Sequence, residues 1–343
     1  MVDNAASSDR RRHWRGFAWL WLAVLAMSVL SVLPYVSSSS EMVRVRHALM
    51  LLDPAANDFS WTPATTPTGF LRESGPVDAA YAQAGAALGL GQLPDDWARA
   101  VAISRHLLSH KPLTGGAIQS DLRDTYRQIV NAGGGYCGDF TRTFMGFALA
   151  AGIPVRAWAF SFDGYGGSGH IWPEIWNRQL GRWQLVDTFN NFYFHRGDGV
   201  AVSALEFRQL LTASPRALYR SLLSQSARPG YVEEEKMWSY YERGLPEWYM
   251  VWGNNVFSYD SEVTAFAPAR WSRALEQLYA VATGVQPGIK LFQPESNNWR
   301  AASLRRLRTQ LLIVLSASAA AIIGLVLSIY QLRAGRTPHR GGK

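Results

Sequence analysis

Two uncharged apolar segments near the ends of the chain constrain its fold more than any other feature. Residues 17–36 and 309–332 contain no charged side chain, and each is about as long as the roughly 20 residues that cross a bilayer core. The sequence therefore predicts two transmembrane helices that flank a domain of residues 37–308. For the first segment a cleaved signal peptide is the alternative, and for the second a buried helix of a soluble domain.

The basic residues of the chain gather beside these segments. Residues 1–16 carry four Arg and two Asp, and residues 300–343 carry seven Arg, one Lys and no acid, which leaves 22 basic and 24 acidic residues in between. Such flanking charge is typical of the cytoplasmic side of a membrane helix, although four arginines between residues 300 and 308 would then lie outside. We therefore predict a two-pass inner-membrane protein, with cytoplasmic tails at 1–16 and 333–343 and a periplasmic domain. No basic patch elsewhere favours nucleic acid as a partner.

Cys137 is the only cysteine in the chain, so an intramolecular disulfide is excluded. Such a thiol is either a small buried side chain or one that is kept for its reactivity. Three glycines at 133–135 precede it, and phenylalanines at helical spacing follow, which predicts a helix from about Cys137 to Gly152. A helix N-terminus favours the nucleophilic thiolate, so Cys137 is a candidate nucleophile.

An antiparallel meander is predicted next, with three strands between residues 155 and 189 joined by short turns. His170 begins the second strand, and Asp187 lies late in the third strand, which covers residues 182–189. The start of one antiparallel strand faces the end of the next, so these two side chains are expected to be neighbours. An acid beside the imidazole would fix its tautomer and leave the other ring nitrogen free to face Cys137.

Four motifs in this region resemble those of the transglutaminase-like superfamily. They are G-x-C-G-D-F at Gly135–Phe140, A-G-I-P-V-R at Ala151–Arg156, G-H-I-W-P-E-I-W at Gly169–Trp176 and W-Q-L-V-D at Trp183–Asp187. The resemblance implies an α+β, papain-like core, in which N-terminal helices and a nucleophile helix pack on an antiparallel sheet. It also implies Cys137 as the nucleophile, His170 as general base and acid, and Asp187 as the residue that orients His170.

The sequence departs from the family pattern at two positions. Pro173 stands in the histidine strand, where an aliphatic residue is usual, and Thr188 stands where the family often has proline. Because proline cannot donate to a sheet ladder, we expect an edge or a bulge at Pro173. Neither departure removes one of the three residues to which the resemblance assigns catalytic roles.

Three further residues are candidates for contact with a substrate. Asn131 precedes Cys137 by six positions, as the oxyanion amide does in papain-like enzymes, although a helix C-cap would explain an asparagine before three glycines equally well. Tyr136 and Trp172 are candidates for the substrate groove, and packing against the sheet is the alternative for Trp172.

No metal site and no cofactor are predicted. His106 and His110 are four positions apart on one predicted helix, which is the separation of two zinc ligands. The residues between them include no glutamate that could act as a base, and no third ligand is evident in the sequence.

The predicted domains follow from these segments. Between the two transmembrane helices they are an N-terminal region at 37–93, a catalytic core at 94–200 and an aromatic-rich, partly helical extension at 201–308. Within the extension, residues 203–211 and 215–224 are predicted helices. The aromatic residues between 237 and 252 would cover the core, rim a substrate groove or touch the membrane interface, and the sequence does not choose among these.

The function that these residues imply is acyl transfer by a membrane-anchored cysteine enzyme. The Cys137 thiolate would attack an amide bond of a protein or peptide substrate, and hydrolysis of the thioester is a simpler expectation than transfer to an amine. The alternative is a non-catalytic papain-like module, in which the extension binds an envelope protein or a polysaccharide. A third hypothesis is a membrane-assembly subunit dominated by the two apolar helices.

Overall fold

The chain divides into two compact units, which are described separately. One unit comprises the chain up to Leu49 together with the chain from Leu304, and the other runs from Met50 to Ser303. The computed structural model describes residues 2–36, 38–55, 57–109, 116–213, 216–223, 233–292 and 297–334.

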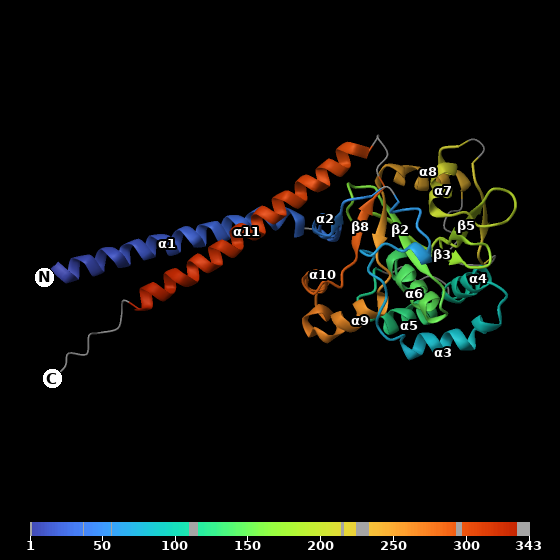
Figure 1. Cartoon of the computed structure of the whole chain (residues 1–343), viewed down its shortest axis with the longest axis horizontal. Helices are drawn as coiled ribbons and strands as arrows, with labels where there is room; N and C mark the ends of the chain where they lie inside the picture. The colour runs from blue at the N-terminus through green and yellow to red at the C-terminus, as the bar shows by residue number, and fades with distance from the viewer. Residues whose placement is uncertain are drawn as a thin grey trace. The chain divides into compact units, whose positions relative to one another are not determined.

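Two long apolar helices make up most of the first unit (Figure 1). Its elements are α1 (Val2–Val32), η1 (Leu33–Val36), α2 (Ser39–Leu49) and most of α11 (Asn298–Ala334). Both α1 and α11 contain a stretch that is long and apolar enough to cross a membrane, which is compatible with a two-pass membrane protein. The two helices touch where a Cβ atom on Gly324 would fall 2.2 Å from the ring of Trp21. Glycine at this position therefore allows the close approach that is typical of paired membrane helices.

A mixed sheet organises the second unit (Figure 1). In the described residues its strand order is β1-β8-β7-β2-β3-β4. The strands are β1 (Leu51–Leu52), β2 (Val155–Ser161), β3 (Gly169–Asn177), β4 (Arg182–Leu185), β7 (Trp248–Trp252) and β8 (Gly288–Leu291). Neighbours are antiparallel except β1 and β8, which are parallel, so the prediction of an antiparallel sheet is wrong at this edge. The sequence did not predict this pair, because β1 has only two residues and its partner lies near the other end of the chain.

The predicted meander of β2, β3 and β4 is confirmed. Its third strand is shorter than predicted, because β4 ends at Leu185 and the chain turns back so that Asp187 bridges Phe192. Asp187 therefore lies beyond the strand, on a turn that leaves its side chain close to the start of β3.

Pro173 lies in an interior strand, since β3 has neighbours on both sides, and the register between β2 and β3 is unbroken across it, so the expected edge or bulge is wrong. Its carbonyl accepts a hydrogen bond from Val186 N at 3.2 Å, just past the end of β4. In an antiparallel pair the N–H and C=O of one residue point to the same neighbour. The missing N–H of Pro173 therefore faces the place where the β3–β4 ladder ends, and no regular ladder bond is lost.

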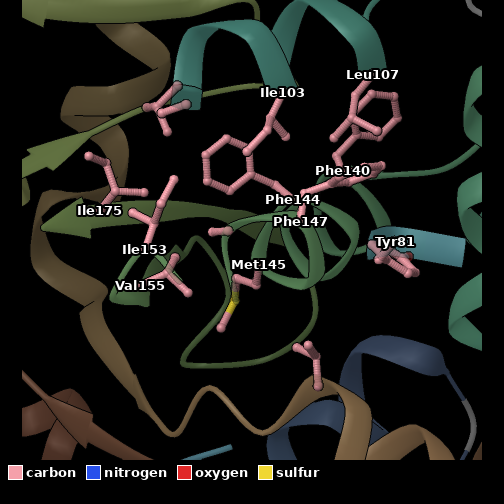
Figure 2. Packing of buried hydrophobic residues seen from close by; sticks show 14 of the residues in the cluster. Tyr81, Ile103, Leu107, Phe140, Phe144, Met145, Phe147, Ile153, Val155 and Ile175 are labelled. Atoms are coloured by element: carbon pink, nitrogen blue, oxygen red, sulfur yellow. The ribbon is translucent and has the colours of Figure 1, made fainter. Parts of the chain in front are cut away.

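Four helices of the second unit precede the meander. They are α3 (Ala79–Ala87), α4 (Asp96–Leu107), α5 (Leu122–Ala132) and α6 (Cys137–Ala150). Of these, α4 and α6 pack against the sheet, and α3 and α5 pack on α6. The start of α6 at Cys137 agrees with the prediction, and Gly152 follows its end with φ 68°, a conformation that favours glycine. Phe144 and Phe147 of α6 pack with Val155 of β2 and with Ile175 in a buried cluster (Figure 2). Replacing one such phenylalanine with alanine costs roughly 3–5 kcal/mol.

The chain after the meander covers the opposite face of the sheet (Figure 1). Its elements there are β5 (Phe192–His195), α7 (Ala204–Leu211), β6 (Leu218–Ser221) and α8 (Glu234–Gly244). Trp158 of β2 and Trp172 of β3 pack with Trp238 and Tyr241 of α8 in a second buried cluster. Of the three alternatives for the aromatic residues between 237 and 252, the structure therefore shows a role in the core.

The helix predicted at 215–224 is wrong, because the described part of this segment forms strand β6. It pairs antiparallel with β5, with Leu218 opposite His195 and Ser221 opposite Phe192. The hydrogen bonds of β5 decide the conformation of this segment, and such pairing overrides a weak local preference.

The remaining elements complete the second unit. They are α9 (Val256–Ala265), α10 (Arg273–Ala282) and the 3₁₀ helices η2 (Pro63–Thr65), η3 (Leu90–Gln92), η4 (Leu245–Glu247) and η5 (Ala267–Arg270). Strands β7 and β8 belong to the segment after residue 200, and they share one sheet with β2 and β3. The predicted core and the predicted extension thus lie within one compact unit.

Candidate active site

His170 and Asp187 form a buried pair at the end of the meander. His170 is the second residue of β3, and its Nε2 lies 2.7 Å from Oδ2 of Asp187. Both side chains are almost completely buried. The strand spacing predicted that these two side chains are neighbours, and in the structure they are.

Cys137 is the first residue of α6 and is partly exposed. Its thiol is close enough to His170 to contribute to the raised pKa of that imidazole. Because Asp187 engages Nε2 of the imidazole, Nδ1 is the ring nitrogen that remains for the thiol. The structure thus brings together the three residues that the sequence singled out, in the order thiol, imidazole and carboxylate.

The surroundings of His170 favour its protonated form. Burial by itself would lower the pKa of His170, but the charge and the hydrogen bond of Asp187, with a contribution from Cys137, raise it to about 10. His170 therefore carries a positive charge at neutral pH, close to Cys137 at the N-terminus of α6.

Two residues that the sequence did not reveal hold the Asp187 carboxylate. Tyr241 of α8 donates its hydroxyl to Oδ2 at 2.6 Å. The side-chain amide of Asn190 donates to the same oxygen at 3.1 Å, and the Asn190 N–H donates to Oδ1 at 3.1 Å. The only signal of Asn190 in the sequence is its position three residues after Asp187, and Tyr241 is one of several aromatic residues in its segment.

Removal of the Tyr241 hydroxyl should destabilise the protein by about 1.5–3 kcal/mol, the usual contribution of a hydrogen bond to a charged group. The test compares unfolding midpoints of Tyr241→Phe and the wild type in one detergent. Tyr240→Phe is the matched control, because the Tyr240 hydroxyl lies at a long 3.5 Å from an uncharged acceptor, the Gly169 carbonyl. Equal losses in the two variants would contradict a specific bond to Asp187.

Aromatic rings enclose the imidazole of His170. The ring centroid of Trp172 lies 5.2 Å away, and those of Tyr240 and Phe160 lie at 5.8 and 5.9 Å. Trp172 is only 1% exposed, so its predicted role in a substrate groove is wrong. Side chains alternate between the two faces along β3, and Trp172 lies on the face that the second buried cluster covers. There its ring packs against the imidazole of His170.

The N-terminus of α6 is fixed by Asp139. Its Oδ2 accepts hydrogen bonds from Tyr136 N at 2.9 Å and from Ile118 N at 3.1 Å. One turn further on, the Thr141 hydroxyl donates to the carbonyl of Ile171, the neighbour of His170, at 3.0 Å. These contacts set the position of Cys137 relative to His170.

Thr188, which replaces the proline common in the family, also has a role in this arrangement. Its buried hydroxyl lies 2.9 Å from the hydroxyl of Ser104 on α4. This bond connects the turn that carries Asp187 to the helical layer.

The two other predicted substrate contacts have different surroundings. Tyr136 is 52% exposed and directly precedes Cys137, as a residue beside a substrate groove would be. Asn131 is exposed on the last turn of α5, and no contact in the described parts of the chain joins it to Cys137 or His170. The C-cap of α5 is Gly133, with φ 66°, so the capping alternative for Asn131 is wrong.

Only one histidine of the pair considered as a metal site is described by the structure. His106 Nε2 lies 2.9 Å from the Tyr126 hydroxyl, and His110 lies outside the described residues. Among the residues described, there is no group of three or more His, Cys, Asp or Glu side chains that could hold a metal ion.

Comparison with known proteins agrees with the motifs. Residues 86–188 match the family model of the transglutaminase-like superfamily. No curated protein and no solved structure matches the chain. The matched segment contains Cys137, His170 and Asp187 but ends before Asn190 and Tyr241. Residues 86–188 of this chain therefore form a domain of the transglutaminase-like superfamily.

Proposed function

We propose that this chain is a membrane-anchored cysteine enzyme that cleaves amide bonds of protein or peptide substrates through a thioester intermediate. The observation that carries the proposal is the juxtaposition of Cys137 with the hydrogen-bonded pair of His170 and Asp187. The thiol is partly exposed, whereas the imidazole and carboxylate are buried. This arrangement supplies a nucleophile, an acid–base group and a residue that orients the latter.

The reaction begins with attack of the Cys137 thiolate on the amide carbonyl carbon. The oxyanion that forms is stabilised by backbone N–H groups at the very start of α6, such as that of Cys137. The His170 imidazolium then gives its Nδ1 proton to the leaving nitrogen, and the C–N bond breaks to leave a thioester. In the second half, neutral His170 takes a proton from water, which attacks the thioester and releases the acid and the thiolate.

Asp187 acts through His170 in both halves of this sequence. Its bond to Nε2 holds the ring with Nδ1 toward the thiol, and its charge stabilises the imidazolium. Tyr241 and Asn190 hold the carboxylate in turn. The segment outside the matched domain thus contributes to the site through α8.

The proposed location is the periplasmic side of the inner membrane, with both termini in the cytoplasm. Two apolar helices that could span a membrane support this, together with the basic residues beside them. A reporter enzyme that is active only in the periplasm, fused after Ser40, should be active. An inactive reporter would place the domain on the other side.

The reactivity of the thiol tests the proposed chemistry. Iodoacetamide should alkylate Cys137 rapidly at neutral pH in the wild type and slowly in His170→Ala, because the imidazolium that favours the thiolate is lost. His195→Ala is the matched control, since His195 is a buried histidine on β5 whose Nδ1 accepts a bond from Gly197 N at 3.1 Å. Slow alkylation that is indifferent to His170 would favour the non-catalytic module instead.

The fate of the thioester separates hydrolysis from transfer to an amine. A mixture of peptides is incubated with the full chain in lipid nanodiscs, with and without a primary amine, and products are identified by mass. Hydrolysis should give free carboxyl ends even when the amine is present. Products that consist mainly of amine adducts would overturn the preference for hydrolysis.

A further inference from the structure

Helix α10 presents apolar side chains to solvent on one face. Trp271, which caps η5 two residues before α10, is 80% exposed, and Leu275 and Leu278 of the helix are 41% and 60% exposed. Leu275 and Leu278 are three residues apart and therefore lie on the same side of the helix, and Trp271 is exposed just before it. We call this set the α10 stripe. In an ordinary surface helix that side would carry polar residues.

The opposite side of α10 carries polar residues that face the protein. Glu276 and Gln277 are both buried, and Glu276 accepts a hydrogen bond from the Tyr259 hydroxyl at 3.0 Å. The charge of Glu276 also helps to raise the pKa of Arg142 on α6, against the lowering effect of burial. The orientation of α10 is therefore fixed by polar contacts, and rotation of the stripe inward would break them.

We propose that the α10 stripe contacts the surface of a lipid bilayer. The helix lies in the chain between two apolar helices that could span a membrane. Tryptophan and leucine are the side chains that interfacial helices bury among lipid headgroups. The segment from 267 to 283 contains two arginines and a single acid, the inward-facing Glu276, so it suits an anionic lipid surface.

The size of the stripe favours lipid over a protein partner. Three side chains are far fewer than the roughly 20–30 residues that each partner contributes to a stable protein–protein interface. A domain that is already tethered to a membrane needs little additional affinity, because the tether raises the effective concentration of lipid. This inference is independent of the chemistry proposed for Cys137.

A single label tests the contact, because Cys137 is the only cysteine in the chain. In a Cys137→Ser background, Leu278→Cys is labelled with an environment-sensitive fluorophore. The full chain is then reconstituted in vesicles that contain anionic phosphatidylglycerol and phosphatidylcholine with brominated acyl chains. Ser261→Cys, at an exposed polar position on α9, is the matched control.

The label at position 278 should lose most of its emission in brominated vesicles relative to unbrominated ones, and the label at 261 should keep it. Leu275→Cys should behave like Leu278→Cys, which guards against a local effect of one substitution. Emission that is unchanged at both stripe positions would overturn the proposal. Energy transfer between donor- and acceptor-labelled copies at 278 without quenching by lipid would also overturn it, and would assign the stripe to a second copy of the chain.

Discussion

The Asp187→Asn variant should react with iodoacetamide at Cys137 at least about tenfold more slowly than the wild type at slightly acidic pH, because the charge of the neighbouring imidazolium is lost. In the wild type, Asp187 is the main cause that raises the pKa of His170 to about 10. Without that charge, burial lowers the pKa of His170, the imidazole becomes neutral, and the thiol keeps its proton.

The dependence of the alkylation rate on pH tests the direction of this effect. A raised histidine pKa means that the imidazolium is present at low and neutral pH and is lost as the pH rises toward about 10. The wild type should therefore exceed Asp187→Asn in alkylation rate most at low and neutral pH, and Asp198→Asn, at an exposed position, should behave like the wild type. A wild-type profile that rises tenfold per pH unit up to about pH 8.5 would show an ordinary thiol and contradict the ion pair.

Loss of the Glu174 charge should destabilise the protein by about 3–5 kcal/mol, the usual result of leaving a buried partner uncompensated. Glu174 Oε2 lies 2.6 Å from Nε of Arg156, and both side chains are buried in the sheet. The carboxylate also accepts bonds from Trp158 Nε1 at 2.9 Å and from Ala204 N at 2.7 Å. The Arg156 guanidinium stacks on the Trp183 ring at 4.0 Å, where water cannot replace the lost partner.

Urea unfolding of Glu174→Gln, followed by tryptophan fluorescence in one detergent, measures this loss. Glu235→Gln is the control, because the Arg216–Glu235 pair is exposed and should contribute less than about 1 kcal/mol. The double variant Arg156→Met/Glu174→Gln should recover part of the loss, since no buried charge remains. A double variant that is less stable than Glu174→Gln would show that Arg156 stabilises the sheet by stacking rather than by its charge.

Features that depend on local patterns were predictable from the sequence. The glycines before Cys137 and the repeat of phenylalanines after it predicted where α6 begins, because helix caps and helical periodicity are properties of neighbouring residues. The short turns of the meander predicted its antiparallel pairing. That pairing in turn brought His170 and Asp187 together, since strand order and turn length leave few other arrangements.

Features that depend on distant segments were not predictable in this way. Strand β6 takes its conformation from β5, and β1 takes its place in the sheet from β8. Trp172 was a candidate for the groove because its motif adjoins His170, but the chain from α8 covers that side of the sheet and buries the ring. The contacts of Asn190 and Tyr241 with Asp187 were not predicted, because no local sequence pattern indicates that an asparagine or a tyrosine binds a particular carboxylate.

The sequence by itself determined the two apolar helices, the start of the nucleophile helix and the order of Cys137, His170 and Asp187, because each rests on hydrophobic runs, caps or short turns. Only the tertiary structure decided how the carboxylate is held and which aromatic rings enclose the imidazole. Those contacts join the turn after β4 to α8, about 50 residues further along the chain, and Tyr241 donates to Asp187 only once α8 packs on the sheet. Packing of α10 against α9 likewise turned the leucines of α10 outward, since the buried bond from Tyr259 to Glu276 fixes which side of that helix faces the protein.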